Sequence, residues 1–398
     1  MRRPSVMSRS SFVAIVFALA SMSGCSGLKL PQVLRIDEDD WPAFGKNQER
    51  TNATSERLVP PLSLAWECDI SSGMGFGSPI VIDSTVIVTN MRGEMYGLNA
   101  NTGKRYGWVN LGEAVHGSPV IDQNVAYVAV SNSRYSLVAY DLVEGAALWK
   151  QSYGDVEVTP TFSNNKLFFG NTSGIFFCVD RTTGLQEWRF RLPDNSKGKG
   201  IHSSAAASDS LIIFGADDGN IYALDTRYST PRWTFTTGAP VFASPAISEG
   251  TVFCGNIDGV LFALDLMTGK EQWRFDAKTS IYATPSFSGG RLLIGTVGRT
   301  LYCLNKDRGT AIWSTDLNGV VNSSAAISGN IAYIGTLKKE LLALKIDDGS
   351  MIWKQALRGR VKTTPAIAHG KLYVATDDRM ILAFRESSIS ESVREKGR

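Results

Sequence analysis

The chain lacks the residue pairs that build common metal and redox sites. Its five cysteines include no adjacent pair, no C-x-x-C spacing and no C-x-x-C-H haem-attachment sequence, and only three histidines occur in 398 residues. Zinc, haem and dithiol chemistry are therefore disfavoured. Outside the first two dozen residues no stretch shows the 3.6-residue period of an amphipathic helix, which points away from a helical architecture.

The sequence also lacks a lasting excess of basic residues. It carries 41 Lys and Arg against 38 Asp and Glu, and removal of residues 1–24 would take away three arginines and no acidic residue, so the formal charge would fall from +3 to zero. Such a chain offers no broad basic surface for nucleic acid. A content of 43% apolar residues, with 38 glycines, indicates a globular and turn-rich protein.

The N-terminus has the pattern of an export signal. Three arginines precede an apolar run from Phe12 to Ala20. Nine apolar residues are too few to cross a bilayer as a helix, but they suit the hydrophobic region of a signal peptide. We therefore expect residues 1–24 to be removed and the protein to be exported.

The end of this signal resembles the lipobox of bacterial lipoproteins. Small residues at 21–24 precede Cys25, which in such proteins is lipidated and becomes the mature N-terminus. Met22 stands where leucine is usual, and an ordinary cleaved signal with an incidental cysteine is the alternative. Ser26, in place of aspartate, favours sorting to the outer membrane, with the protein facing the periplasm.

Tryptophan recurs with a period of about 40 residues. The intervals between the eight copies are 42, 41, 39, 45, 40, 40 and 40 residues, a period typical of propeller blades. The eight tryptophans are Trp66, Trp108, Trp149, Trp188, Trp233, Trp273, Trp313 and Trp353. Between them lie short strands rich in Val, Ile, Tyr and Phe, separated by Asp-Gly and Thr-Gly turns. The pattern predicts an all-β, eight-bladed β-propeller of four-stranded antiparallel blades.

The two ends of the repeat complete each other. The last copy, from about Gly359 to Arg385, has three strands and no tryptophan, while Trp66 precedes the first full copy without strands of its own. We expect residues 62–68 to form the outer strand of the eighth blade and to close the ring. The predicted organisation is a signal at 1–24, a lipidated tether at 25–60, a propeller at 61–386 and a polar, disordered tail at 387–398.

A small residue precedes each of the seven tryptophans after Trp66 by ten or eleven positions, and a small residue also fills the equivalent position of the last copy. These residues are Gly97, Ala139, Cys178, Ala223, Ala263, Cys303, Ala343 and Ala383. A bulky indole needs a shallow surface, so we expect each tryptophan to dock between blades on backbone that a small residue exposes, with a nearby glycine setting the turn. On this interpretation Cys178 and Cys303 are small core residues.

The segments from the small residue to the tryptophan resemble the tryptophan docking motif A-x-D-x-x-T-G-x-x-x-W of pyrroloquinoline-quinone-repeat propellers. "ALDLMTGKEQW" at 263–273 matches it fully, and "CVDRTTGLQEW" at 178–188 departs only at the first residue. The segment "DWPAFGKNQERTN" at 40–52 resembles the stretch that often precedes such propellers. The resemblance covers about 325 residues and implies the fold, not the function.

Two functional classes share this fold: lipoproteins of the outer-membrane β-barrel assembly machine (the BamB type) and quinoprotein dehydrogenases. Size and lipid signal favour the first, a non-catalytic scaffold that binds a protein partner and needs no cofactor. Resemblance to the assembly lipoprotein implies a surface for the barrel protein that uses a Leu-x-Leu-Arg stretch and a nearby Asp-x-Asp. The corresponding positions here read Gly198-Lys199-Gly200-Ile201 and Pro240-Val241-Phe242, so neither motif is present. We therefore do not carry that binding site over to this chain. The alternative, an enzyme using pyrroloquinoline quinone with Ca²⁺, is disfavoured because the chain lacks adjacent cysteines and clustered carboxylates.

One position varies freely, two residues before the Ser or Thr that begins each blade. It is occupied by Phe76, His116, Glu157, His202, Phe242, Tyr282, Asn322 and Lys362. We expect these eight residues, here called the mouth ring, to gather at one mouth of the central channel, where they could bind a peptide, a glycan or a small polar ligand. The alternative is a set of solvated residues around a wide, water-filled opening.

The sequence leaves two interpretations each for the pair of histidines in the mouth ring and for one long loop. His116 and His202 lie two blades apart, and a zinc site would need at least one more close ligand. The stretch "LPDNSKGKGIH" at 192–202 is about five residues longer than its counterparts, so it is either a partner-binding loop or a tolerated insertion. His369, in the turn "AHG", is expected to be solvent-exposed.

Overall fold

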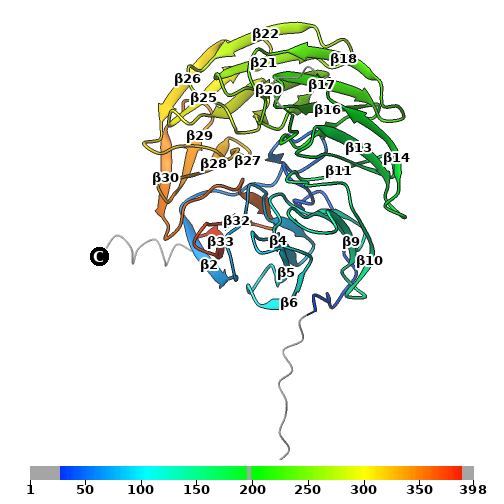
Figure 1. Cartoon of the computed structure of the whole chain (residues 1–398). Helices are drawn as coiled ribbons and strands as arrows, with labels where there is room; N and C mark the ends of the chain where they lie inside the picture. The colour runs from blue at the N-terminus through cyan, green and yellow to red at the C-terminus, as the bar shows by residue number, and fades with distance from the viewer. Residues whose placement is uncertain (1–26, 195–198, 388–398) are drawn as a thin grey trace, which may run out of the picture.

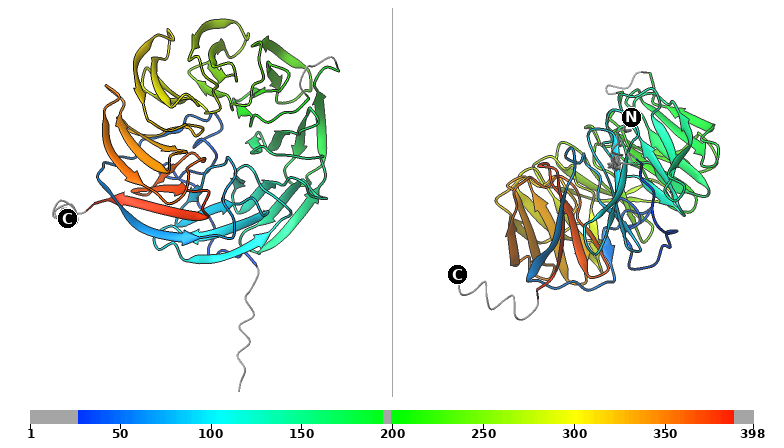
Figure 2. Two further views of the ribbon diagram at one scale, coloured as in Figure 1. Left: turned by 60° about the vertical axis from the view of Figure 1, so that its left-hand side comes forward. Right: turned by 90° about the horizontal axis from the view of Figure 1, so that it is seen from below.

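The computed structural model describes residues 27–194 and 199–387, and this part of the chain consists of strands and turns without a helix. The strands form eight sheets arranged as a ring around a central channel (Figures 1 and 2). Each sheet contains a meander of four antiparallel strands, so the protein is an eight-bladed β-propeller, as predicted. Because these residues hold no helix at all, they also hold none that could cross a membrane.

The blades are numbered in chain order, each from its innermost to its outermost strand. Blades 1 to 4 contain β3 (Ile80–Ile82), β4 (Thr85–Thr89), β5 (Glu94–Asn99) and β6 (Arg105–Asn110); β7 (Val120–Asp122), β8 (Val125–Ala129), β9 (Leu137–Asp141) and β10 (Ala146–Gln151); β11 (Thr161–Ser163), β12 (Lys166–Gly170), β13 (Ile175–Asp180) and β14 (Gln186–Arg191); β15 (Ala206–Ala207), β16 (Leu211–Gly215), β17 (Asn220–Asp225) and β18 (Pro231–Thr236). Blades 5 to 8 contain β19 (Ala246–Ser248), β20 (Thr251–Gly255), β21 (Val260–Asp265) and β22 (Glu271–Asp276); β23 (Ser286–Ser288), β24 (Arg291–Gly295), β25 (Thr300–Asn305) and β26 (Ala311–Asp316); β27 (Ala326–Ser328), β28 (Ile331–Thr336), β29 (Glu340–Lys345) and β30 (Met351–Ala356); β31 (Ala366–Ala368), β32 (Lys371–Ala375), β33 (Met380–Glu386) and β2 (Leu62–Asp69).

The burial of the strands follows their place in the blade. In β20 and β21 almost every residue is buried, because both faces of the sheet pack on neighbouring blades. In β22 exposed and covered residues alternate, as expected for the outermost strand with one face in solvent. The core of the protein is therefore a set of apolar layers between adjacent sheets, and not one central cluster.

The ring closes at blade 8, where the N-terminal strand β2 pairs antiparallel with the C-terminal strand β33. Trp66 on β2 lies opposite Ala383 on β33. The expected closing strand at residues 62–68 is confirmed, one residue shorter than the observed strand. Two segments more than 300 residues apart thus share one sheet, and neither end of the repeat is left as an exposed edge.

Five tryptophans dock on the following blade with the same geometry. Their indole N–H groups donate to backbone carbonyls of the turn between the third and fourth strands, at 2.8–3.0 Å: Trp66 to Ala100, Trp149 to Arg181, Trp233 to Leu266, Trp273 to Lys306 and Trp313 to Ile346. The rings lie against the turn glycines Gly103, Gly184, Gly269, Gly309 and Gly349, where an added Cβ would overlap the indole. Docking between blades is therefore confirmed at these positions.

The small residue before each tryptophan has a different role from the one expected. Ala263 is the cross-strand neighbour of Trp273 within the same blade, and the small residue and the tryptophan pair in the same way in every other blade except blade 1. It therefore leaves room beside the indole in its own sheet, while the glycine of the next blade supplies the docking surface. The glycine has φ of +68° at Gly309, so it also sets the turn as predicted.

Trp108 does not dock in this way, which corrects the prediction of eight equivalent tryptophans. It stands eleven residues after Gly97 instead of ten, and it pairs with Tyr96, while Gly107 pairs with Gly97. Because side chains alternate along a strand, this one-residue shift turns the indole to the other face. Leu28 fills the vacated space: its side chain lies against Gly97, and it is fully buried.

Trp188 and Trp353 also lack the shared contact. The turn that follows Trp188 in blade 4 has no glycine, and the indole N–H is buried without a hydrogen-bond partner. Trp353 meets blade 8 through an edge-to-face contact with Phe384. Both side chains remain partly covered, so they contribute apolar packing without the directional bond.

A belt of hydroxyl groups links the blades around the channel. In six places the backbone N–H of a Ser or Thr near the innermost strand donates to the hydroxyl of its counterpart in the next blade, at 2.7–3.2 Å. The belt consists of Ser78, Ser118, Thr159, Ser204, Ser244, Thr284, Ser324 and Thr364. All are buried, which explains why each blade begins with Ser or Thr: these hydroxyls satisfy amides that cannot reach water.

Residues 27–60, here called the strap, run across the propeller (Figure 1) and form hydrogen bonds with every blade. Backbone carbonyls of residues 48–52 accept hydrogen bonds from the innermost strands of blades 4 to 7, and β1 (Ala53–Thr54) adds a parallel strand to β27. Leu30 bonds to blade 2, and Trp41 forms a bridge with Val81 in blade 1. The part of the expected tether that the structure describes is thus folded against the propeller, because its leucines and Trp41 are buried.

The docking of Trp273 on Gly309 can be tested by adding one methyl group. Gly309→Ala places a Cβ against the indole, whereas Gly329→Ala adds a Cβ at a similar positive φ, +56°, with no atom within 4 Å. Both variants carry the backbone strain, so we expect Gly309→Ala to lower the free energy of unfolding by about 1–3 kcal/mol more than Gly329→Ala. Urea denaturation measures this difference. Equal losses in the two variants would show that the indole contact is not what requires the glycine.

Candidate functional site

All eight residues of the mouth ring line one cavity of about 450 Å³ in the central channel. Each stands four residues before the innermost strand of its blade, as Phe242 does before β19, so the rotational repeat of the fold brings the eight side chains to the same level. Phe44 of the strap also lines the cavity. The expected gathering is therefore observed, and the strap adds a lining residue that the repeat alone did not predict.

Three ionisable side chains lie next to one another on blades 2, 3 and 4. Glu157 of blade 3 stands between His116 of blade 2 and His202 of blade 4: its carboxylate oxygens lie 4.0 Å from Nε2 of His116 and 3.8 Å from Nε2 of His202. The side chains are 17–35% exposed, so solvent reaches them from the cavity. The three residues are neighbours because they occupy equivalent positions on consecutive blades.

Asp217 orients His202 from outside the ring. The Nδ1 atom of His202 lies 2.9 and 3.0 Å from the two oxygens of Asp217, and this hydrogen bond raises the pKa of His202 above its ordinary value. Gly200 makes the approach possible, because a Cβ there would overlap Asp217 and His202, and its carbonyl accepts from the Asp217 amide. Asp217 stands thirteen residues after Ser204, a position that the other blades fill with different residue types, such as Thr172 and Ile257. The repeat therefore gave no sign of its role, and the sequence analysis missed it.

The next two blades, 5 and 6, present aromatic side chains to the cavity. The rings of Phe242 and Tyr282 are parallel within 3° and their centroids are 6.1 Å apart, while the ring of His202 meets Phe242 edge-on. Phe76 is 65% exposed at the mouth. Together with Asn322 and Lys362, these side chains give the cavity one apolar wall and a scattered set of polar groups, which suits binding of a small ligand or chain segment.

A second cavity of about 490 Å³ lies between the strap and blades 2 and 3. Phe44 and Thr159 line both cavities. Arg50 lines the second one, and its guanidinium donates to the carbonyls of Phe44 and Ala205 and to the hydroxyl of Thr161. Burial lowers the pKa of Arg50 to about 9. The residue fastens the strap to the inner ends of the blades, which is a structural role.

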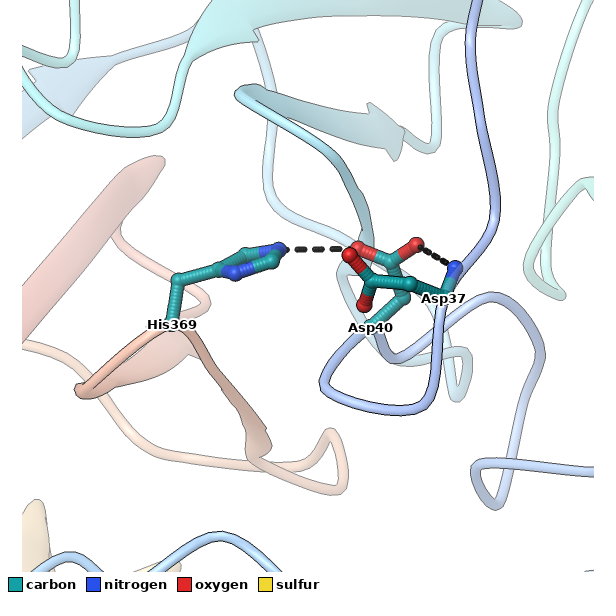
Figure 3. Close-up of side chains that lie close together, drawn as sticks. All are labelled: Asp37, Asp40 and His369. Carbon is teal, nitrogen blue, oxygen red and sulfur yellow. Dashed lines mark hydrogen bonds and ion pairs between the residues drawn. The ribbon is translucent and has the colours of Figure 1, made fainter.

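Asp37, Asp40 and His369 form the cluster shown in Figure 3. Asp40 is fully buried, and its carboxylate accepts hydrogen bonds from the Asp37 and Asp83 amides at 2.7 Å and from Nε2 of His369 at 2.8 Å. His369 is therefore not simply solvent-exposed, as expected from the sequence, but ties blade 8 to the strap. Both carboxylate oxygens of Asp40 are already engaged, so the cluster is explained as a structural contact.

The four described cysteines are free and buried. Cys178 and Cys303 are completely inaccessible, which confirms them as core residues, and burial raises the pKa of Cys178 to about 12. A thiolate nucleophile is thus disfavoured. Cys25 lies outside the described residues, as do residues 195–198 of the long loop and the tail from residue 388.

The residues around the main cavity do not fit a quinone held by Ca²⁺. Calcium takes six to eight oxygen ligands, often from several carboxylates. Among the residues that line the cavity, Glu157 supplies the single carboxylate and Asn322 the single amide, while the hydroxyls belong largely to the interblade belt. The donor set is therefore too poor for such a site.

Comparison with protein families gives matches across nearly the whole propeller. A family model described as "Outer membrane protein assembly factor BamB" matches residues 63–195, 173–284, 258–330 and 300–388. Together these segments span 63–388, which is well over half of the chain.

Curated relatives fall into two classes. The outer membrane protein assembly factor BamB of Burkholderia pseudomallei is 22% identical over 195 residues, which are 48% of this chain and 50% of that protein. The BamB of Legionella pneumophila is 25% identical over 38% of this chain and 40% of its own length. The dehydrogenase subunit of the quinone alcohol dehydrogenase of Komagataeibacter europaeus is 29% identical over 49% of this chain and 31% of its own length. The chain thus spans half or less of each relative.

Solved structures divide in the same way. BamB from Moraxella catarrhalis superposes with a TM-score of 0.70 at 18% identity, covering 81% of this chain and 99% of that one. The quinohemoprotein alcohol dehydrogenase ADHIIG from Pseudomonas putida gives a TM-score of 0.74 at 15% identity, covering 88% of this chain and 80% of that one. At these identities the likeness shows the propeller fold alone.

The hydrogen bonds of two histidines predict the direction in which their pKa values are shifted. Hydrogen bonds with Asp217 and Asp40 raise the pKa values of His202 and His369, so both should titrate above about 6.5, the ordinary histidine value. Asp217→Asn should lower the pKa of His202 and leave that of His369 unchanged. NMR of the three histidine rings measures both values.

The hydrogen bond between His202 and Asp217 also determines how the free energy of unfolding depends on pH. A pKa that folding raises adds stability that is fully present below about pH 6.5 and is lost as the pH rises through the folded-state value. The free energy of unfolding should therefore differ most between wild type and Asp217→Asn below that pH. A difference that grows with pH would contradict the assigned hydrogen bond.

Proposed function

Because this chain belongs to the family described as outer membrane protein assembly factor BamB, we propose that it is a non-catalytic scaffold, anchored by a lipid to the outer membrane and facing the periplasm. It would bind a protein partner, such as an outer-membrane barrel assembly protein. The observation that carries the proposal is the family match over residues 63–388, together with a channel whose lining shows no arrangement suited to the quinone chemistry of the other relatives.

An exposed apolar rim supports a role in protein binding. The turns between the third and fourth strands of blades 3, 4 and 5 carry Leu185, Tyr228 and Met267, which are 59%, 59% and 52% exposed. In blade 6 the same turn carries Asp307 and Arg308 instead. Three large apolar side chains on consecutive blades form a surface that a partner could cover. We propose this rim as the contact surface.

The proposed anchor is Cys25. Two residues after it the described chain begins with Gly27, and the strap is fastened to blades 1 and 2 from Leu28 onward. A lipid on Cys25 would therefore hold the propeller close to the membrane, because almost no free chain separates the two. The lipobox-like sequence is the support for this part of the proposal.

Photo-crosslinking from the rim tests the scaffold. A photoreactive phenylalanine analogue at Tyr228 should crosslink, in membranes of the native host, to an outer-membrane barrel assembly protein identified by mass spectrometry. The same analogue at Asp307, in the equivalent turn of blade 6, is the matched control and should give at least about tenfold less product, because an exposed charged turn is a poor hot spot.

The anchor is tested in the same preparation. Cys25→Ser should release the protein from the membrane fraction and reduce the Tyr228 crosslink, while leaving the fold intact by circular dichroism. Recovery of no membrane partner from Tyr228, or equal products from both positions, would count against the proposed rim. Retention of Cys25→Ser in the membrane would refute the lipid anchor.

A quinone-dependent dehydrogenase is the second candidate, favoured by the structural match to ADHIIG. We expect the purified protein, mixed with pyrroloquinoline quinone and Ca²⁺, to show neither a bound-quinone absorption spectrum nor dye-linked oxidation of alcohols, because the cavity lacks the oxygen donors described above. A known quinoprotein processed in parallel controls for reconstitution. Stoichiometric quinone binding with alcohol-dependent dye reduction would replace the scaffold by the enzyme.

A further inference from the structure

Five polar side chains around the main cavity make no hydrogen bond to the protein within the part of the chain that the structure describes. They are His116, Glu157, Tyr282, Asn322 and Lys362. The carboxylate oxygens of Glu157 lie 4.0 and 3.8 Å from the nearest histidine nitrogens, too far for hydrogen bonds. The side-chain oxygen of Asn322 is buried and has no partner. The hydrogen-bonding capacity of these groups is therefore available to a molecule in the channel.

Backbone amides at the inner ends of the blades are already engaged. The amides of Thr159 and Ser204 donate to belt hydroxyls, and the amides of Phe76 and Gly77 donate to the carbonyl of His116. A peptide is recognised largely through its backbone, which pairs with exposed backbone groups of the receptor. The free partners around this cavity are side chains instead, which favours a ligand that carries hydroxyl groups over a peptide.

Aromatic rings are exposed beside these polar groups. Phe76 is 65% and Tyr282 is 42% exposed, and both line the cavity. The ring of Phe242 lies parallel to that of Tyr282 within 3°, so the two present flat apolar surfaces in the same orientation. The C–H face of a pyranose ring packs on such a surface, while the hydroxyl groups at its edge reach the polar groups beside it.

The charges around the cavity favour a neutral ligand. Among the residues that line it, Glu157 supplies the single carboxylate and Lys362 the single ammonium group, while His202 is bonded to Asp217 outside the ring. An ion of either sign therefore meets one attractive and one repulsive group. Neutral hydroxyl groups, by contrast, donate to a carboxylate and accept from an ammonium group, and such charge-assisted hydrogen bonds are strong.

We propose that the channel cavity binds a neutral saccharide, with one pyranose ring packed on Phe242 and Tyr282 and its hydroxyl groups bonded to the unpartnered polar side chains. The volume of about 450 Å³ lies within the range of small-molecule sites, roughly 300–1,000 Å³. The inference does not depend on the proposed scaffold function. Tyr228 precedes β18 and Phe242 follows it, so the rim and the mouth ring lie at opposite ends of that strand.

Isothermal titration calorimetry with cellobiose, maltose and N,N′-diacetylchitobiose tests the proposal on the purified protein. At least one of these saccharides should bind once per chain with a Kd below about 1 mM. Tyr282→Ala should weaken binding at least about tenfold, because the stacking surface is lost. Glu157→Gln should weaken it about 10–100-fold, because hydroxyl groups lose a charged acceptor. Tyr135→Ala is the matched control: this tyrosine is 37% exposed but lies outside the cavity lining, so binding should equal that of wild type.

NMR of the wild-type protein gives a readout that requires no variant to fold. The bound saccharide should shift the ring resonances of His116 and His202 and leave those of His369 in place. Failure of all three saccharides to bind, equal losses in Tyr135→Ala and Tyr282→Ala, or binding of the peptide Gly-Tyr-Gly in their place would overturn the proposal. Crosslinking from Tyr228 is unaffected by these outcomes, so failure of the saccharide site and failure of the scaffold are separately visible.

Discussion

Closure of the ring is the constraint on which the rest of this structure depends. A blade buries its two faces only if it has a neighbour on each side, so an open array would leave two apolar faces in water. Pairing of β2 with β33 removes both at once, and Trp66 carries the docking contact across the junction to Gly103. The hydroxyl belt and the strap then bind the closed ring from inside and across its end.

A closed ring separates residues that hold the fold from residues that are free to vary. The Ser and Thr of the belt are buried and bonded, whereas the side chains two positions earlier face the channel and carry little of the packing. The mouth ring can therefore differ from blade to blade without loss of the fold. It contains two histidines and a glutamate on blades 2 to 4 and two parallel aromatic rings on blades 5 and 6.

The same architecture explains why relatives of two functional classes match this chain. Relatives named as assembly factors and relatives named as quinone-dependent dehydrogenases both match this chain, because the packing of blades is a requirement of the fold and not of one function. Here the channel offers one carboxylate and the rim offers Leu185, Tyr228 and Met267, which agrees better with a binding role than with quinone chemistry.

The 40-residue period by itself determined the number of blades, the closing strand around Trp66 and the set of eight mouth residues, because each follows from repetition along the chain. Tertiary structure decided what repetition does not encode. The strap belongs to no repeat, so its burial was invisible beforehand, and so were Phe44 in the channel and the support of His202 by Asp217. Trp108 shows the limit most directly: one extra residue turned its indole to the opposite face of the strand, and Leu28 from a distant segment took its place.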